Sequence, residues 1–315
     1  MRLLHAVFLL IKDSVAAFLR DQATIYAAGL AYYTIFALAP LLILVIAVSG
    51  FFIGRSAASD QIILQLQYLV GAQLSGFLEG IVGAINDQTA GGALTVISVV
   101  GLLLGASGIF NQLKTALNIL WGIMADRPEN AREVLLLARS RAIPFLMIFV
   151  LGLMLSVVVL LEAIVGIVQA RLEVLYPEAA ALVPSINWVI IPGLTFLTFA
   201  LIYKVLPDAR TRWRDIALGA LLATLLFLLG RYVLFQFLTP GGNSAVYGAA
   251  SSLIGLLVWV YYSAIILLLG AEFIKVYAAR YGQPIRPSET ARFRGDPVIS
   301  DWASTKTLQP DDRLA

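Results

Sequence analysis

The 315-residue sequence contains no cysteine and a single histidine, His5. The absence of cysteine excludes disulfides, thiolate metal sites, iron–sulfur clusters and cysteine nucleophiles. A single histidine leaves no imidazole cluster for zinc and none for a Ser–His dyad. We therefore predict no catalytic residues, no metal site and no cofactor, and we expect that the protein is not an enzyme.

Charged residues are also scarce. They make up 13% of the chain, whereas an average soluble domain carries about 25%. Hydrophobic residues make up 60% and the mean hydropathy is +0.89. Because the apolar residues gather in runs of about twenty or more, the sequence excludes a soluble protein and predicts one polytopic membrane unit.

Six apolar runs are long enough to cross a hydrocarbon core, which takes about 20 helical residues. They lack the alternation of a transmembrane β-barrel, and they are apolar on both faces. We therefore predict an all-α integral membrane protein with six transmembrane helices. The runs lie at Ala27–Ile53, Gly92–Phe110, Ile143–Val168, Ile186–Tyr203, Ile216–Leu238 and Ala249–Ile274.

The basic residues predict the orientation of these spans. Of the 22 Lys and Arg, 19 fall in the N-terminal segment, in the second and fourth connections and in the C-terminal tail. Positively charged loops stay in the cytoplasm, so both termini are predicted to be cytoplasmic. Membrane topology therefore explains the net charge of +3. Binding to nucleic acid is not needed as an explanation, and the chain shows no aromatic stacking platform or recognition motif for it.

The chain divides into three parts by composition. Residues 1–26 predict an amphipathic helix, which lies either in the membrane interface or on the cytoplasmic side of the bundle. Residues 27–282 form the six-helix membrane domain, with further amphipathic helices expected at Ile62–Val70 and Leu74–Ile85. Residues 283–315, rich in proline and mixed charge, predict a disordered cytoplasmic tail.

Two charged residues lie deep within predicted spans, where a charge costs roughly 2.5 to 3.5 kcal/mol. Glu162 and Arg231 are each about 10 to 12 Å from the outward end of their spans at 1.5 Å per residue. Equal depth and opposite charge suggest an ion pair, and the alternative is that each side chain snorkels to the outer interface.

A second polar set lies toward the cytoplasmic side. Tyr32, Tyr33, Lys204 and Glu272 are candidates for a substrate pathway, although tyrosine and lysine are also the usual interface anchors. The other candidates for this pathway are Glu162, Arg231, Tyr261 and Tyr262. Glu272 interrupts an apolar run, and Lys204 is a plausible partner for it. Near mid-membrane, Tyr261 and Tyr262 each need a hydrogen-bond partner from another helix.

Several patches together resemble the YihY/BrkB family of inner-membrane proteins, once labelled ribonuclease BN. The patches are AAGLAYYTIFALAPLL from Ala27, GIFNQLKTALNILWGI from Gly108, YKVLPDARTRWRDIALGALLA from Tyr203, and SAVYGAASSLIGLLVWVYYSAIILLLGAEF from Ser244. The resemblance implies six spans, cytoplasmic termini and a place in the bacterial inner membrane. Besides Tyr33, Lys204 and Glu272, it picks out Pro40, Asn118, Trp121, Pro207, Trp213, Tyr247 and Gly248.

Function follows less directly than fold. The ribonuclease label is disfavoured, because the chain lacks the clustered histidines and carboxylates that phosphodiester hydrolysis needs. We expect a transporter or flippase for an anionic lipid or lipopolysaccharide precursor, attracted by a basic inner rim that includes Arg210, Arg212 and Arg214. The alternative is a membrane scaffold or regulator of envelope biogenesis that transports nothing. Oligomeric state is not predicted.

Overall fold

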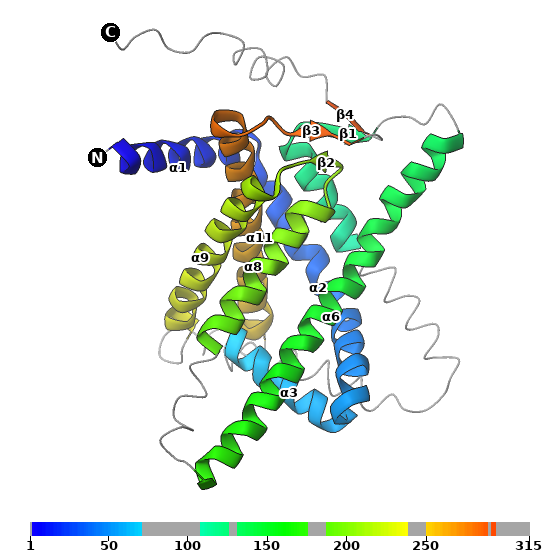
Figure 1. Ribbon diagram of the computed structural model, residues 1–315, viewed down its shortest axis with the longest axis vertical. Coiled ribbons are helices and arrows are strands. Elements are labelled where there is room, and N and C mark those ends of the chain that lie inside the picture. Colours follow the sequence, from blue (N-terminus) through cyan, green and yellow to red (C-terminus); the bar gives the residue numbers. More distant parts are fainter. Residues whose placement is uncertain are drawn as a thin grey trace.

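The computed structural model describes residues 2–70, 108–125, 131–175, 187–238, 250–288 and 291–293. These residues form long helices joined by short connections, with two small strand pairs (Figure 1). The described helices include α1 (Arg2–Arg20), α2 (Ala23–Ile53), α3 (Arg55–Val70), α6 (Ala131–Leu175), α8 (Asn187–Val205), α9 (Trp213–Leu238) and α11 (Ala250–Tyr281). Residues 108–120 are also helical.

Three described segments are long and apolar enough to cross a membrane: Phe149–Leu172 in α6, Trp213–Val233 in α9 and Gly255–Tyr281 in α11. Shorter apolar segments, Leu44–Ile53 and Val189–Val205, lie in α2 and α8. Five of the six predicted spans therefore coincide with described helices. The predicted span Gly92–Phe110 lies almost wholly outside the described residues.

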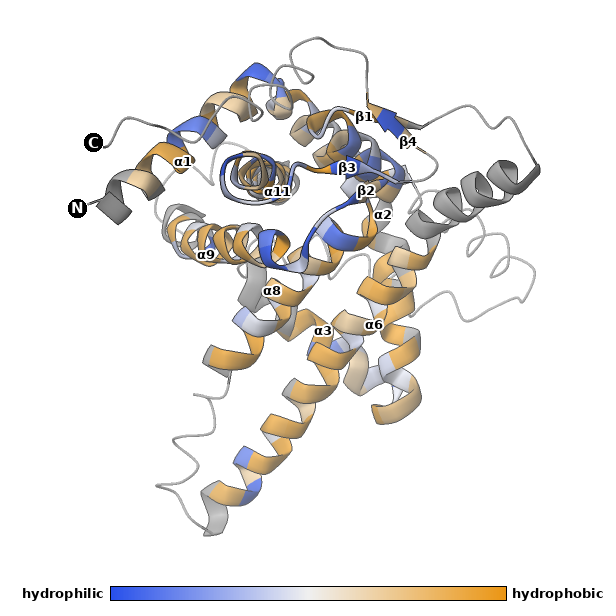
Figure 2. Ribbon diagram, turned by 45° about the horizontal axis from the view of Figure 1, so that its top comes forward, coloured by the Kyte–Doolittle hydropathy of each residue, from blue (hydrophilic) through white to orange (hydrophobic). Residues whose placement is uncertain are grey.

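Helix α11 is the centre of the bundle. It packs against α2, α9 and α1, while α8 packs on α9, and α2 packs on α6 and α3. In contrast, α6 crosses the bundle at an angle and presents much of its apolar surface outward (Figure 2). Leu146, Phe149, Leu153, Ile164 and Ile167 are exposed along it. An apolar surface of this extent suits contact with lipid tails rather than water.

Three glycines allow α8, α9 and α11 to approach one another closely. A Cβ atom on Gly219 of α9 would collide with Ile274 of α11, and a Cβ on Gly230 would collide with the Tyr262 hydroxyl. Gly270 of α11 leaves room for the Tyr203 hydroxyl from α8. Small residues at these positions let α8, α9 and α11 pack more tightly than larger side chains allow.

One end of the helical bundle carries α1 and both strand pairs, and we call it the capped end (Figure 1). There β1 (Ile123–Ala125) pairs antiparallel with β4 (Ala291–Phe293), and β2 (Ala209–Arg210) pairs with β3 (Arg286–Pro287). The chain is thus mostly helical, as the sequence predicts, with two short strand pairs that the sequence does not predict. Strands of two or three residues are too short to show alternating hydrophobicity, so sequence periodicity cannot reveal them.

Strands β3 and β4 belong to the segment that the sequence assigns to a disordered tail. Ile285, just before β3, is buried, and the backbone N–H of Ser288 donates to the carbonyl oxygen of Asp208 at 2.9 Å. Residues 282–288 and 291–293 thus pack on the capped end. Residues beyond 293 lie outside the described part of the chain.

Helix α1 (Arg2–Arg20) lies where the sequence predicts an N-terminal helix. One face packs on α11 through Leu10 and Ala17 against Val276. A second apolar face is open, with Phe8 and Leu19 each 63% exposed. Because α1 lies across the end of the bundle rather than along it (Figure 1), its open face suits the membrane interface. The packing on α11 fits the alternative of a helix held on the bundle, and a place in the membrane interface stays a prediction.

Candidate functional site

A network of charged side chains lies where α1 turns into α2. Helix α1 ends at Arg20, and Gln22 adopts a left-handed backbone conformation (φ 51°) before α2 begins. This turn places Asp21 against α11, where the ammonium of Lys275 donates a hydrogen bond to its carboxylate. The guanidinium of Arg20 also contacts the Asp21 carboxylate, at 3.0 Å.

Glu272 is the buried member of this network. Its side chain is fully enclosed, and its carboxylate oxygen Oε2 lies 3.1 Å from Nζ of Lys275, one helical turn along α11. Oε2 nevertheless has no well-angled hydrogen-bond donor among the described residues. One ammonium therefore serves two carboxylates, those of Asp21 and Glu272, and a charge enclosed in this way is stable only while its counter-ion stays in place.

The pKa of Asp21 reflects this arrangement. Partial burial acts to raise it, but the hydrogen bonds and positive charges of Lys275 and Arg20 outweigh burial. The net result is a pKa below the ordinary value of an aspartate. Asp21 is thus a stable anion at neutral pH, and it ties α1 to α11.

A second polar cluster joins the connections at the capped end. Asp208 accepts a hydrogen bond from the Asn118 side-chain amide at 3.1 Å and forms an ion pair with Lys114 at 3.0 Å. The backbone N–H of Asp208 donates in turn to Oδ1 of Asn118 at 2.9 Å. All three side chains are nearly buried. The cluster fixes the connection after α8 against the helix of residues 108–120.

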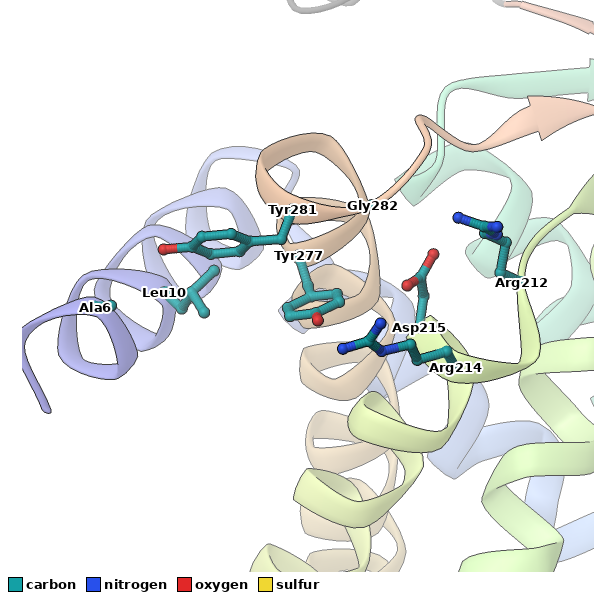
Figure 3. Close-up of a pocket in the computed structure, with 8 residues that line it drawn as sticks. All are labelled: Ala6, Leu10, Arg212, Arg214, Asp215, Tyr277, Tyr281 and Gly282. Atoms are coloured by element: carbon teal, nitrogen blue, oxygen red, sulfur yellow. The ribbon is translucent and has the colours of Figure 1, made fainter. Parts of the chain in front are cut away.

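A cavity of about 470 Å³ lies between α1, the start of α9 and the end of α11. Figure 3 shows Arg212 and Arg214 on one side of it, Tyr277 and Tyr281 from α11, and Leu10 from α1 on the other. Ala6, Asp215 and Gly282 complete the lining. The cavity therefore combines positive charge with an apolar wall.

Only part of the polar set that the sequence predicts toward the cytoplasmic side lies together in the structure. Glu272 is paired with Lys275, whereas the ammonium of Lys204 donates to the carbonyl oxygen of Thr211 and lies 5.5 Å from the centre of the Trp213 ring. The suggested Lys204–Glu272 pair is thus replaced by two separate contacts. Tyr32 and Tyr33 pack edge to face, with ring centres 5.7 Å apart, and both are exposed.

Of the two tyrosines predicted to lie near mid-membrane, Tyr262 has a hydrogen-bond partner on another helix. The Tyr262 hydroxyl on α11 donates to the carbonyl oxygen of Leu226 on α9 at 3.0 Å, which confirms a partner on another helix. Tyr261 is partly buried beside the main core. Tyr203, which the sequence does not single out, is fully buried and donates to the carbonyl oxygen of Leu267 at 2.7 Å.

The proposed ion pair between Glu162 and Arg231 stays a prediction. Both lie in helices, α6 and α9, but the side chain of Glu162 is outside the described part. Arg231 is half-buried and has interactions of its own. The main neighbours of α6 are α2, α3 and α8, and those of α9 are α8 and α11.

Most family-motif positions have structural roles. Asn118 holds Asp208, and the indole N–H of Trp121 donates to the carbonyl oxygen of Ala271 at 3.1 Å, next to Glu272. Pro207 is buried in the connection after α8. Trp213 begins α9, and Pro40 lies within α2. Tyr247 and Gly248 are outside the described residues.

Sequence reasoning misses Asp21, Lys114 and Asp208 as site residues. Lys275 sits three residues after Glu272, so helical spacing could have identified that partner. The contacts of Asp21 with Lys275 and of Asp208 with Lys114 span much of the chain, and no local pattern signals them. Among the described residues, no three His, Asp or Glu side chains gather as metal ligands would.

Long apolar helices around a central α11, with charges gathered mainly at their ends, define a polytopic helical membrane protein. The family model described as "Virulence factor BrkB" matches residues 14–293, and the chain belongs to this family, the YihY/BrkB membrane proteins. Residues 14–293 include both polar clusters and all of the cavity lining except Ala6 and Leu10.

Curated relatives carry names that state membrane location only. A UPF0761 membrane protein of Xanthomonas campestris is 28% identical over 278 residues, covering 85% of this chain and 60% of its own length. Another from Alteromonas mediterranea is 28% identical over 261 residues, covering 80% of this chain and 82% of its own. The chain thus spans about three fifths of the Xanthomonas protein. No solved structure matches it.

Proposed function

We propose that the protein is a transporter or flippase that moves an anionic, lipid-like substrate across the bacterial inner membrane. It crosses the membrane six times, with both termini in the cytoplasm, and it makes and breaks no covalent bonds in the substrate. In this orientation the capped end is the cytoplasmic end.

The observation that carries the proposal is the network of Asp21, Lys275 and Glu272. A fully enclosed carboxylate within a segment apolar enough to span a membrane is costly to maintain, and such residues commonly mark substrate or ion pathways. A scaffold needs no charge at this position, since apolar residues of similar volume are often as stabilising as a buried ion pair. The network also joins the interfacial helix α1 to the central helix α11.

Lipid movement can be measured directly. Purified protein is reconstituted into liposomes that contain fluorescent phosphatidylglycerol, and a membrane-impermeant reductant then reports how much probe reaches the outer leaflet. We expect the wild type to increase probe movement and Glu272→Gln to reduce it at least tenfold. Asp60→Asn, an exposed carboxylate on α3, removes the same charge and should leave movement unchanged.

Two outcomes would count against this proposal. If wild-type protein moves none of several anionic lipids, the transport class fails, and the scaffold becomes the favoured function. If movement is intact in Glu272→Gln, transport stands but the network is not part of it.

The orientation has its own test, because a chain without cysteine gives no background in thiol labelling. Ser56→Cys, exposed at the start of α3, should react with a membrane-impermeant maleimide on intact spheroplasts. Gln283→Cys, exposed after α11, should react only after permeabilisation. The reverse pattern would refute cytoplasmic termini.

A further inference from the structure

We propose that the cavity between α1, α9 and α11 binds the phosphate-bearing headgroup of an anionic phospholipid. This inference rests on the proposed function, since it names the substrate class and the place where the substrate enters. The ligand lies with its phosphate at Arg212 and Arg214 and with the start of its acyl chains along α1.

The size of the cavity suits such a group. Small-molecule sites typically occupy about 300 to 1,000 Å³, and this cavity measures about 470 Å³. Its lining comes from three parts of the chain that are far apart in sequence: the first half of α1, the start of α9 and the end of α11. The positive-inside rule explains arginines in this connection, but it does not require them to line one hollow together with tyrosines.

The charges favour an anion. Both guanidinium groups are exposed, and neither Arg212 nor Arg214 forms an ion pair with a carboxylate in the part of the chain that the structure describes. Arginine binds phosphate through paired N–H donors with a geometry that lysine lacks. The two residues flank Trp213, where the 26-residue helix α9 begins, and the partial positive charge of a helix start adds to theirs.

Asp215 opposes this charge in part and gives the cavity some selectivity. Its side chain is buried, and it lies close to Gly282, where a Cβ atom would come within 2.9 Å of Oδ2. With two arginines and one aspartate, the lining carries a net charge of +1. A phosphodiester bearing a single negative charge and a hydroxyl-rich headgroup matches this, because the Asp215 carboxylate can accept a hydrogen bond from a hydroxyl.

The apolar side of the cavity indicates a lipid rather than a soluble phosphate ester. Ala6 and Leu10 come from the interfacial helix α1, whose neighbouring apolar residues Phe8 and Ile11 are exposed. Tyr277 and Tyr281 have ring centres 5.7 Å apart, and tyrosine is enriched at the level of lipid headgroups. A headgroup in the cavity thus has an apolar surface beside it on which its chains can lie.

Binding can be tested on the full-length protein in detergent by native mass spectrometry. The probes are phosphatidylglycerol, phosphatidylcholine as a lipid without net charge, and free glycerol phosphate. We expect phosphatidylglycerol to bind more tightly than either. Its affinity should fall about 25-fold in Arg212→Gln/Arg214→Gln, from about fivefold for each cation near an anionic lipid. Arg55→Gln/Arg171→Gln, which removes two exposed charges on α3 and α6, outside the cavity lining, should retain wild-type affinity.

A steric variant tests the cavity without changing charge. Ala6→Trp fills the hollow from α1 and should also weaken phosphatidylglycerol binding at least fivefold. This variant keeps the inference testable if the double arginine variant does not fold. Unchanged affinity in both variants would overturn the assigned site. If glycerol phosphate binds as tightly as phosphatidylglycerol, the assignment of a lipid as the ligand is overturned.

The binding assay separates this inference from the proposed function. If phosphatidylglycerol binding depends on Arg212 and Arg214 but liposomes show no lipid movement, the site stands and the transport proposal fails. If lipid moves normally in Arg212→Gln/Arg214→Gln, the transport proposal stands and the cavity is not its entry site.

Discussion

Replacing Gly270 with alanine tests the packing of the bundle around α11. A Cβ atom at this position would overlap the Tyr203 hydroxyl and lie 3.1 Å from Cβ of Ala223, whereas ordinary contacts begin at about 3.4 Å. Tyr203 is fully buried, and its hydroxyl donates to the carbonyl oxygen of Leu267 at 2.7 Å. Because Tyr203 is buried, moving its hydroxyl away from the added Cβ atom would strain this hydrogen bond.

The expected cost follows from two contributions. Overpacking of a dense core costs about 1 to 3 kcal/mol, and loss of the Tyr203 hydrogen bond adds about 1 kcal/mol. Gly270→Ala should therefore lower the free energy of unfolding by about 2 to 4 kcal/mol. Gly166→Ala and Gly193→Ala are matched controls, because neither glycine has an atom within 4 Å of the added Cβ. Both should be neutral or slightly stabilising, since alanine favours a helix over glycine.

Unfolding can be followed by tryptophan fluorescence during titration with sodium dodecyl sulfate in mixed micelles. The double variant Gly270→Ala/Tyr203→Phe removes the overlapping hydroxyl and should recover part of the loss, so the two changes should be strongly non-additive. The reasoning is refuted if Gly270→Ala unfolds like Gly193→Ala, or if Tyr203→Phe gives no recovery.

Three further predictions concern the charged groups. The pKa of Asp21 is lowered in the folded protein. The ionised Asp21 side chain therefore stabilises the fold fully above about pH 4, and this stabilisation is lost as the pH falls through the folded-state pKa. The difference in thermal stability between wild type and Asp21→Asn should accordingly shrink between about pH 6 and pH 3. Asp208→Ala leaves nearly buried Lys114 without its counter-ion and should cost about 2 to 4 kcal/mol in the same unfolding titration, with a smaller loss when Lys114→Met is added. Reversing the charges of Glu162 and Arg231 together should restore the stability that either single reversal removes, and absence of rescue would show that they do not pair.

The helices were predictable because the signal for a membrane span is strong. About twenty consecutive apolar residues are rare in soluble domains and match the thickness of a bilayer, and the predicted end of the first span at Ile53 coincides with the end of α2. Other limits differ: α6 extends past both ends of the predicted span Ile143–Val168, and α11 continues to Tyr281, beyond the predicted end at Ile274. Its last two turns are more polar, but they pack against α1 and so remain helical.

The candidate site was only half predictable. Glu272 stands out in the sequence because it interrupts an apolar run, and a charge in such a place needs a reason. Its surroundings do not stand out. Asp21 reaches Lys275 across 254 residues of sequence, and Asn118 reaches Asp208 across 90. Contacts of this kind depend on how helices pack, and one sequence contains no record of that packing.

One helix links the network to the cavity. From Glu272 to Tyr281, α11 carries the enclosed carboxylate, the lysine that neutralises it and the two tyrosines of the cavity. Helix α1 is held to this same stretch by Asp21 on Lys275 and by Asp13, which forms an ion pair with Arg280 at 3.1 Å. Because one short segment positions both the cavity and the network, α1 cannot move away from α11 without opening the cavity and removing a counter-ion from Lys275. These ion pairs therefore couple the position of α1 to that of α11.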